Sequence, residues 1–135
     1  MQPMTLPSGV RTVRLIAYVQ GVLGVLNGAL LIFGGAAYAT VGGVGGAGGT
    51  ALYVAIGVLV LAISALLIWA GRLLGRLSRP ARLGILAFEY ASIVLGLLSY
   101  ADPLQAALRI VLAVVAIYYL QFDSRTRAVF APPTA

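Results

Sequence analysis

Long apolar runs separated by short polar or glycine-rich segments dominate this chain. Four of these runs contain about 20 residues and carry at most one charged side chain near their centres, and a helix needs roughly this length to cross the hydrocarbon core of a bilayer. The pattern therefore predicts four transmembrane helices. Their expected limits are residues 13–36, 51–71, 81–100 and 103–122.

Residues that start or stop helices stand between the runs. Thr50 is expected to cap the second helix. Asp102, followed by Pro103 at the first helical position and Gln105 at the third, is typical of a strong helix start. Residues 71–84 form a hinge between the second and third helices, in which the helix is expected to run on past Trp69 before Pro80 changes its direction.

The two ends of the chain lack a helical period. Residues 1–10 contain Pro3, Pro7 and Gly9, which predicts a short disordered tail, and a second disordered tail is expected after the arginines that follow the fourth run. A cleaved signal peptide is the competing interpretation of the first run, because Ala37-Tyr38-Ala39 has the spelling of a cleavage site. The length of the run favours a spanning helix.

A glycine-rich segment, residues 41–49, has the spelling of a dinucleotide-binding motif. That motif requires a strand before it and an acidic residue about 20 positions after it. Here an apolar helix precedes the segment and an apolar run follows it. We therefore interpret it as a flexible connection between the first two helices.

Small residues recur along one face of each predicted helix. In lipid, helices associate through such faces, because the tails are as apolar as a leucine side chain and there is no hydrophobic drive between helices. The expected fold is an all-α membrane protein, a single four-helix transmembrane domain packed as an antiparallel bundle. The residues expected to bring the helices together are Gly24, Gly28, Gly57 and Gly96.

Composition excludes most enzyme classes. Apolar residues make up 61% of the chain and charged residues 9%, and Cys and His are absent. Thiolate and imidazole chemistry is thereby excluded, and the three acids, Glu89, Asp102 and Asp123, are predicted at different depths. We expect no enzyme activity, no metal site and no cofactor.

The charges set the orientation. All nine basic residues are arginines and the net charge is +6. Eight of them lie in the N-terminal flank, the hinge and the C-terminal tail, which four spans place on one side of the membrane, and positive residues favour the cytoplasmic side. We expect a multi-pass protein of a bacterial-type cytoplasmic membrane with both termini inside. The hinge arginines, expected to mark topology or to bind anionic lipid headgroups, are Arg72, Arg76, Arg79 and Arg82.

Polar residues inside the spans are predicted to form two layers. Counting from the nearest cytoplasmic arginine at about 1.5 Å per residue places four of them about 9 to 12 Å deep. This inner polar layer is Gln20, Ser64, Glu89 and Tyr119. The outer polar layer is Asn27 and Arg109, beside the space left by Gly57 and Gly96.

Glu89 has two interpretations. An ionisable group inside a membrane is by default a candidate for proton exchange or cation binding. The alternative is a neutral carboxyl group, hydrogen-bonded to Gln20 or Tyr119, that holds the bundle or a partner subunit together. Arg109 is expected to reach the outer interface rather than to pair with Glu89.

The size of the chain and its single intramembrane Glu are similar to those of the small multidrug resistance transporters, four-span proteins that work as dimers around one essential Glu. The likeness is one of format. In that family the Glu lies in the first span, where this chain has Gln20, whereas Glu89 lies in the third, within Ala87-Phe88-Glu89-Tyr90. No residue role is carried over.

The pattern favours a non-enzymatic accessory or assembly subunit that acts through helix packing. The expected partners are the bilayer, other membrane subunits or further copies of the chain, and no nucleic acid. The alternative is a small homo-oligomeric transporter or channel, proton-coupled or exporting a cation, that uses Glu89.

Overall fold

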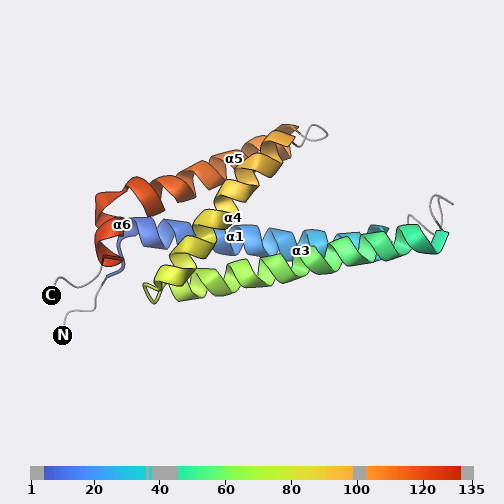
Figure 1. The fold of residues 1–135 in the computed structure, drawn as a ribbon, viewed down its shortest axis with the longest axis horizontal. Coiled ribbons are helices and arrows are strands. Elements are labelled where there is room, and N and C mark those ends of the chain that lie inside the picture. The colour runs from blue at the N-terminus through green and yellow to red at the C-terminus, as the bar shows by residue number, and fades with distance from the viewer. Residues whose placement is uncertain (1–4, 36, 38–45, 99–102, 132–135) are drawn as a thin grey trace. The chain divides into compact units, whose positions relative to one another are not determined.

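The computed structural model describes residues 5–35, 37, 46–98 and 103–131, and these residues are almost entirely helical (Figure 1). Four helices are long and apolar enough to cross a membrane, at Ser8–Gly35, Gly48–Leu74, Arg79–Leu97 and Pro103–Phe122. The prediction of an all-helical chain with four such helices is confirmed. The elements are α1 (Ser8–Leu30), the π-helical turn η1 (Leu31–Gly35), α3 (Gly46–Leu74), α4 (Arg79–Leu98), α5 (Pro103–Ile117), the π-helical turn η2 (Tyr118–Phe122) and α6 (Ser124–Val129).

The first two long helices, α1 and α3, both begin earlier than expected. Helix α1 begins at Ser8, so the prediction of a disordered tail through Val10 was wrong for its last three residues. Val10 is fully buried, and this tertiary packing supplies the stabilisation that the local sequence lacks. Helix α3 begins at Gly46, so Thr50 lies inside the helix rather than at its cap. A helix satisfies its own backbone groups, which favours extending it through glycines. The rest of the glycine-rich segment, 41–45, lies outside the described residues.

The hinge begins with a closed helix end. Helix α3 runs on to Leu74, past Trp69 as expected. The amide of Ser78 donates to the carbonyl of Leu73 at 3.2 Å and that of Leu77 to Leu74 at 2.9 Å, the two bonds of a Schellman motif. Leu77 takes the left-handed position of this motif with φ 56°, where glycine is the usual residue. Pro80 then occupies the second position of α4, where its missing N–H costs little.

The described contacts divide the chain into two compact units. The unit Tyr18–Trp69 is the hairpin of α1 and α3. Its helices run in opposite directions, since Gly21 meets Ile68 at one end and Gly35 meets Tyr53 at the other.

Glycine backbones make the closest contacts within this hairpin. A Cβ atom built on Gly28 would lie 3.0 Å from the carbonyl oxygen of Gly57, and one built on Gly57 would lie 2.8 Å from that of Gly28. Gly24 lies directly against the Ser64 side chain. A side chain at Gly28 or Gly57 would force the two backbones apart, and one at Gly24 would displace the Ser64 side chain.

The second unit comprises Met1–Ala17 and Ala70–Ala135. In it α4 and α5 lie side by side in opposite directions (Figure 1): Gly96 lies against Ile110, and Arg82 reaches the carbonyl of Leu120. Pro103 begins α5 as predicted, whereas Asp102, its expected cap, lies outside the described residues.

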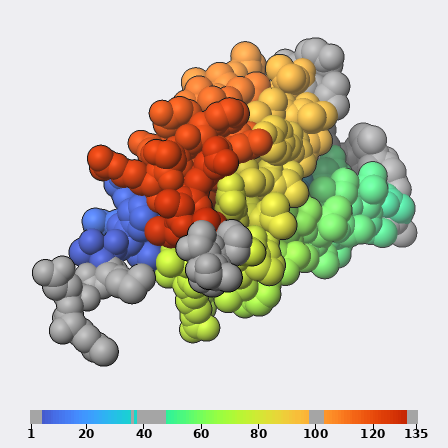
Figure 2. All heavy atoms as spheres, turned by 60° about the vertical axis from the view of Figure 1, so that its left-hand side comes forward, coloured from blue at the N-terminus to red at the C-terminus, as the bar shows by residue number. Residues whose placement is uncertain are grey.

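The C-terminal segment is folded onto this unit. The sequence predicted a tail after Phe122, but α6 forms there. Its Thr126 lies against Gly9 of α1, and Phe130, which follows α6, accepts a hydrogen bond from Arg79 at the start of α4. Figure 2 shows this C-terminal segment in red beside the blue N-terminal segment. Each of these segments contributes buried side chains to this unit, and such packing stabilises a helix of six residues. The buried side chains are Val10, Val13, Leu74, Ile85, Leu120, Thr126 and Phe130.

Candidate functional site

Glu89 is fully buried in the middle of α4. It continues a buried face of that helix, following Ala81 and Ile85 and preceding Ser92 and Gly96. A carboxyl group in such a place is expensive to keep charged in a membrane, where ionisable groups are few and face the protein interior. Glu89 therefore remains the candidate for intramembrane chemistry.

Gln20 and Ser64 lie at neighbouring levels of the other unit. Gly21 of α1 lies near the backbone oxygen of Ser64, and Gly24 lies near the Ser64 side chain. Gln20 is the residue before Gly21. The Ser64 hydroxyl donates to the carbonyl of Val60 one turn earlier, at 2.7 Å, the usual way for a serine in an apolar helix to satisfy its polar group. Ser64 is thus both a buried polar group and a small packing residue.

The ring of Tyr119 packs against Gly9 in the first turn of α1. The inner polar layer draws two residues from each unit, Glu89 and Tyr119 from one, Gln20 and Ser64 from the other, and it stays a prediction. Of the outer polar layer, Asn27 is exposed on α1 and Arg109 is half-buried on α5, and this layer too stays a prediction.

The start of α6 is capped by Asp123. Its Oδ2 accepts hydrogen bonds from the backbone amide of Thr126 at 2.9 Å and from the Thr126 hydroxyl at 2.5 Å. These two bonds, the hydroxyl bond foremost, lower the pKa of Asp123 below its ordinary value of 3.8, because they stabilise the carboxylate. Thr126 is fully buried, so the cap is also part of the core.

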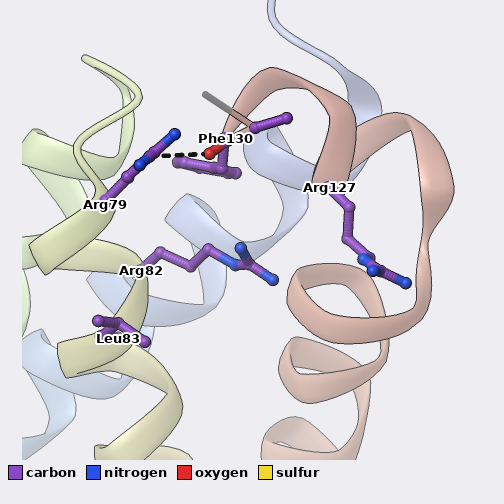
Figure 3. Close-up of a pocket in the computed structure, with 6 residues that line it drawn as sticks. Arg79, Arg82, Leu83, Arg127 and Phe130 are labelled. Atoms are coloured by element: carbon purple, nitrogen blue, oxygen red, sulfur yellow. Dashed lines mark hydrogen bonds between the residues drawn. The ribbon is translucent and has the colours of Figure 1, made fainter. Parts of the chain in front are cut away.

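An arginine-lined pocket of about 390 Å³ lies between α4 and the C-terminal segment. Its lining residues are Arg79, Arg82, Leu83, Arg127, Phe130 and Ala131. We call it the arginine pocket. Figure 3 shows Arg79 and Arg82 extending from α4 toward Phe130 and the C-terminal segment, whereas Arg127 lies on the C-terminal segment with its guanidinium group turned away from Phe130.

Two of these arginines are held in place by backbone carbonyls. Arg79 donates through Nε to the carbonyl of Phe130 at 3.0 Å. Arg82 donates through Nε and Nη2 to that of Leu120, at 3.1 and 2.8 Å, and its Cζ lies 5.5 Å from the centre of the Phe130 ring, within the range of a cation–π contact. Both carbonyls lie at helix ends, where cations are favoured.

Arg127 and Phe130 were not predicted as pocket residues, because their segment was expected to be a tail. The sequence does contain a pattern that predicts this short helix. Asp123, after the last apolar run, is a typical helix start, and Pro132 and Pro133, after the next apolar residues, are a typical helix stop. Only two of the four hinge arginines line the pocket: Arg79 and Arg82 do, and Arg72 and Arg76 do not.

Within the described residues, no group of three or more acidic side chains is placed to hold a metal ion. Among the described residues, the candidates for polar chemistry are the buried carboxyl group of Glu89 in α4 and the arginines that line the arginine pocket. No family model, curated protein or solved structure matches this chain. Four apolar helices are compatible with a small multi-pass integral membrane protein.

Proposed function

We propose that this protein is a non-enzymatic accessory or assembly subunit that acts through helix packing in the membrane. The observation that carries the proposal is a second face of small residues on α3. Ala51, Ala55, Ala62 and Ala65 share one side of the helix and are exposed, whereas Gly57 and Ser64, on the other side, already pack against α1.

An exposed alanine face is what one membrane helix offers another. Small residues let two backbones approach closely, and the resulting van der Waals contact drives association in lipid. The large apolar side chains beside it, such as Leu59 and Leu66, are also exposed. The partner that fits is an apolar helix of a second subunit, from another membrane protein or a further copy of this chain.

Bulky substitutions on this face test the proposal. Ala55→Leu combined with Ala62→Leu should abolish the native assembly, measured as the mass of the protein purified in a mild detergent. The matched control is Ala91→Leu with Ala107→Leu, at exposed alanines of α4 and α5, which should leave the assembly intact. A mass that is the same in both variants and in the unmodified protein would rule out this face as the contact.

We further propose a bacterial-type cytoplasmic membrane as the location, an antiparallel arrangement of the four spans and both termini on the cytoplasmic side. The arginine distribution supports this orientation. So does the contact between Gly9, in the first turn of α1, and Thr126, in α6, since residues that touch lie on the same side of a bilayer.

Labelling of single engineered cysteines tests the orientation, because the natural chain has none. Ser78→Cys and Ser124→Cys should react with an impermeant thiol reagent only from the cytoplasmic side. Gly48→Cys, at a position with no atom within 4 Å of an added Cβ, should react only from the outside. Reaction of Gly48→Cys and Ser78→Cys from the same side would overturn the orientation.

Transport around Glu89 is the second candidate function, and the complete burial of Glu89 favours it. In that case a small homo-oligomer conducts protons or exports a cation. Glu89→Gln keeps the size of the side chain and removes the titrating group, so it should abolish proton-linked flux into liposomes without lowering stability. Unchanged flux with Glu89→Gln, together with unfolding by Glu89→Leu, would leave only the structural role.

A further inference from the structure

We infer that the arginine pocket binds a phosphate group, as carried by an anionic lipid headgroup or by a free phosphate ester. Three arginines, Arg79, Arg82 and Arg127, line one opening, and none of the described residues that line it is acidic. Positive charges brought together in this way repel one another, and an anion between them removes that repulsion. The other two hinge arginines, Arg72 and Arg76, are not among the residues that line the pocket.

The hydrogen bonds inside the pocket leave donors for a ligand. A guanidinium group has five N–H donors. The bonds to described residues use one of them in Arg79 and two in Arg82. The side chain of Arg127 forms no hydrogen bond with the described residues, and it is exposed. The carbonyl contacts hold Arg79 and Arg82 in fixed positions, so little side-chain entropy is lost when a ligand binds.

The number and geometry of the donors favour phosphate over carboxylate. Guanidinium groups match phosphate and carboxylate oxygens in paired hydrogen bonds. The two oxygens of a carboxylate lie in one plane, whereas the tetrahedral arrangement of phosphate oxygens allows arginines to approach from several directions. The pocket volume of about 390 Å³ lies within the range of about 300 to 1,000 Å³ that small-molecule sites occupy.

The position of the pocket favours a lipid as the source of the phosphate. The pocket lies at the start of α4, where a candidate span begins, and one of its apolar lining residues, Leu83, is 66% exposed. A headgroup phosphate bound by the arginines would place an acyl chain along this side of α4. The source of the phosphate rests on the proposed membrane insertion, but the binding of phosphate does not depend on the subunit role.

Arg127→Gln is the decisive variant, because its side chain takes no part in the described hydrogen bonds and its loss should leave the fold intact. The matched control is Arg125→Gln, an exposed arginine of the same helix that does not line the pocket. Losing one charge-assisted contact should weaken binding about tenfold or more. The control should bind as the unmodified protein does.

Two measurements separate the possible sources. Native mass spectrometry in a mild detergent counts bound phosphatidylglycerol against phosphatidylcholine, and titration of inorganic phosphate is followed through the arginine Nε resonances in phosphatidylcholine nanodiscs. Phosphatidylglycerol retained by the protein and lost with Arg127→Gln identifies a lipid headgroup. Resonances shifted by inorganic phosphate, without selective lipid retention, identify a soluble phosphate.

Absence of both effects, or equal weakening by Arg125→Gln and Arg127→Gln, would overturn the inference, since only general charge attraction would then remain. The outcome is separable from that of the proposed function. A protein that assembles through the alanine face of α3 but binds no phosphate contradicts the pocket proposal alone.

Discussion

Gly9 lies directly against the hydroxyl of Thr126, so that the first turn of α1 and the short helix α6 are in contact although their residues are far apart in the chain. The Tyr119 ring and the Asp123 carboxylate border the same glycine. A Cβ atom at this position would overlap the Thr126 hydroxyl, so any other residue type forces the neighbouring side chains to shift. This contact fixes α6, and through α6 it positions Arg127 and Phe130.

Substitution of Gly9 should therefore loosen the C-terminal segment. We expect Gly9→Ala to lower the free energy of unfolding by about 1 to 3 kcal/mol, as overpacking does in other well-packed sites. The stability can be followed by circular dichroism during titration with SDS. The cleavage of α6 by trypsin should become faster in the same variant.

Gly84→Ala is the matched control for this substitution. Gly84 lies within α4 with no atom within 4 Å of an added Cβ, so alanine there should raise the stability by about 0.5 to 1 kcal/mol. Equal effects of the two substitutions would show that Gly9 does not hold α6 in place.

The hairpin of α1 and α3 should be equally sensitive at Gly28. A Cβ atom there meets the Gly57 carbonyl oxygen at 3.0 Å, and a backbone atom yields less readily than the end of a side chain. We expect Gly28→Ala to destabilise the protein by about 1 to 3 kcal/mol in the SDS titration. Gly34→Ala, where an added Cβ has no neighbour within 4 Å, should be close to neutral, and a comparable loss there would contradict the explanation.

Leu77→Gly should stabilise the hinge. Leu77 holds φ 56°, and this conformation costs a residue with a Cβ atom about 1 to 2 kcal/mol. Part of the gain is offset by the greater freedom of glycine in the unfolded chain, so we expect a net increase of about 0.5 to 1 kcal/mol. Thermal unfolding in detergent measures it.

Leu73→Gly removes the same side chain from the last turn of α3 and is the appropriate comparison. It should lower the stability by about 1 kcal/mol or more, since glycine is unfavourable within a helix. A loss of stability with Leu77→Gly would mean that the Leu77 side chain matters more than its backbone strain.

The Asp123 cap should make α6 dependent on pH. The pKa of Asp123 is lowered in the folded protein, chiefly by the Thr126 hydroxyl. The ionised carboxylate therefore stabilises the folded state at pH values above 3.8, the ordinary pKa of this group. This contribution is lost as the pH falls below 3.8 and through the lower pKa of the folded state. The carboxyl ¹³C resonance of Asp123, titrated from about pH 6 to about pH 2, reports the pKa directly.

Thr126→Val removes the hydroxyl and should move the pKa of Asp123 upward, so that α6 is lost at a higher pH. Ser124→Ala, at the exposed neighbouring position, should leave the titration unchanged. An identical titration of Asp123 in the Thr126→Val variant would contradict the assigned cause.

The pattern of apolar and polar residues predicted which segments are helical, but it misplaced the starts of two helices. Pro103 begins α5 where expected, and α3 runs past Trp69 as expected. The starts of α1 and α3 were misplaced because burial of Val10 and continuous backbone hydrogen bonding outweigh the weak helix preference of the local residues. Helix α6 was missed because its six residues are too few to be stable without a packing partner.

The predicted polar layers show where sequence reasoning ends. Counting along a helix gives depth, which is why Gln20, Ser64, Glu89 and Tyr119 could be grouped. The rotation of a helix about its axis decides which side chain meets which, and that depends on contacts with other helices. The structure resolves such contacts within each unit, as for Ser64 with Gly24 and Tyr119 with Gly9.

The amino-acid sequence by itself determined the number of apolar helices, because the length of an apolar run can be read without knowing any tertiary contact. It also showed that the arginines are concentrated in the hinge and the two flanks of the chain. Only the tertiary structure decided that Arg79 and Arg82 share a pocket with Arg127, while Arg72 and Arg76 do not. The reason is that α6 exists only where Thr126 can pack on Gly9, a contact between opposite ends of the chain that no local pattern encodes.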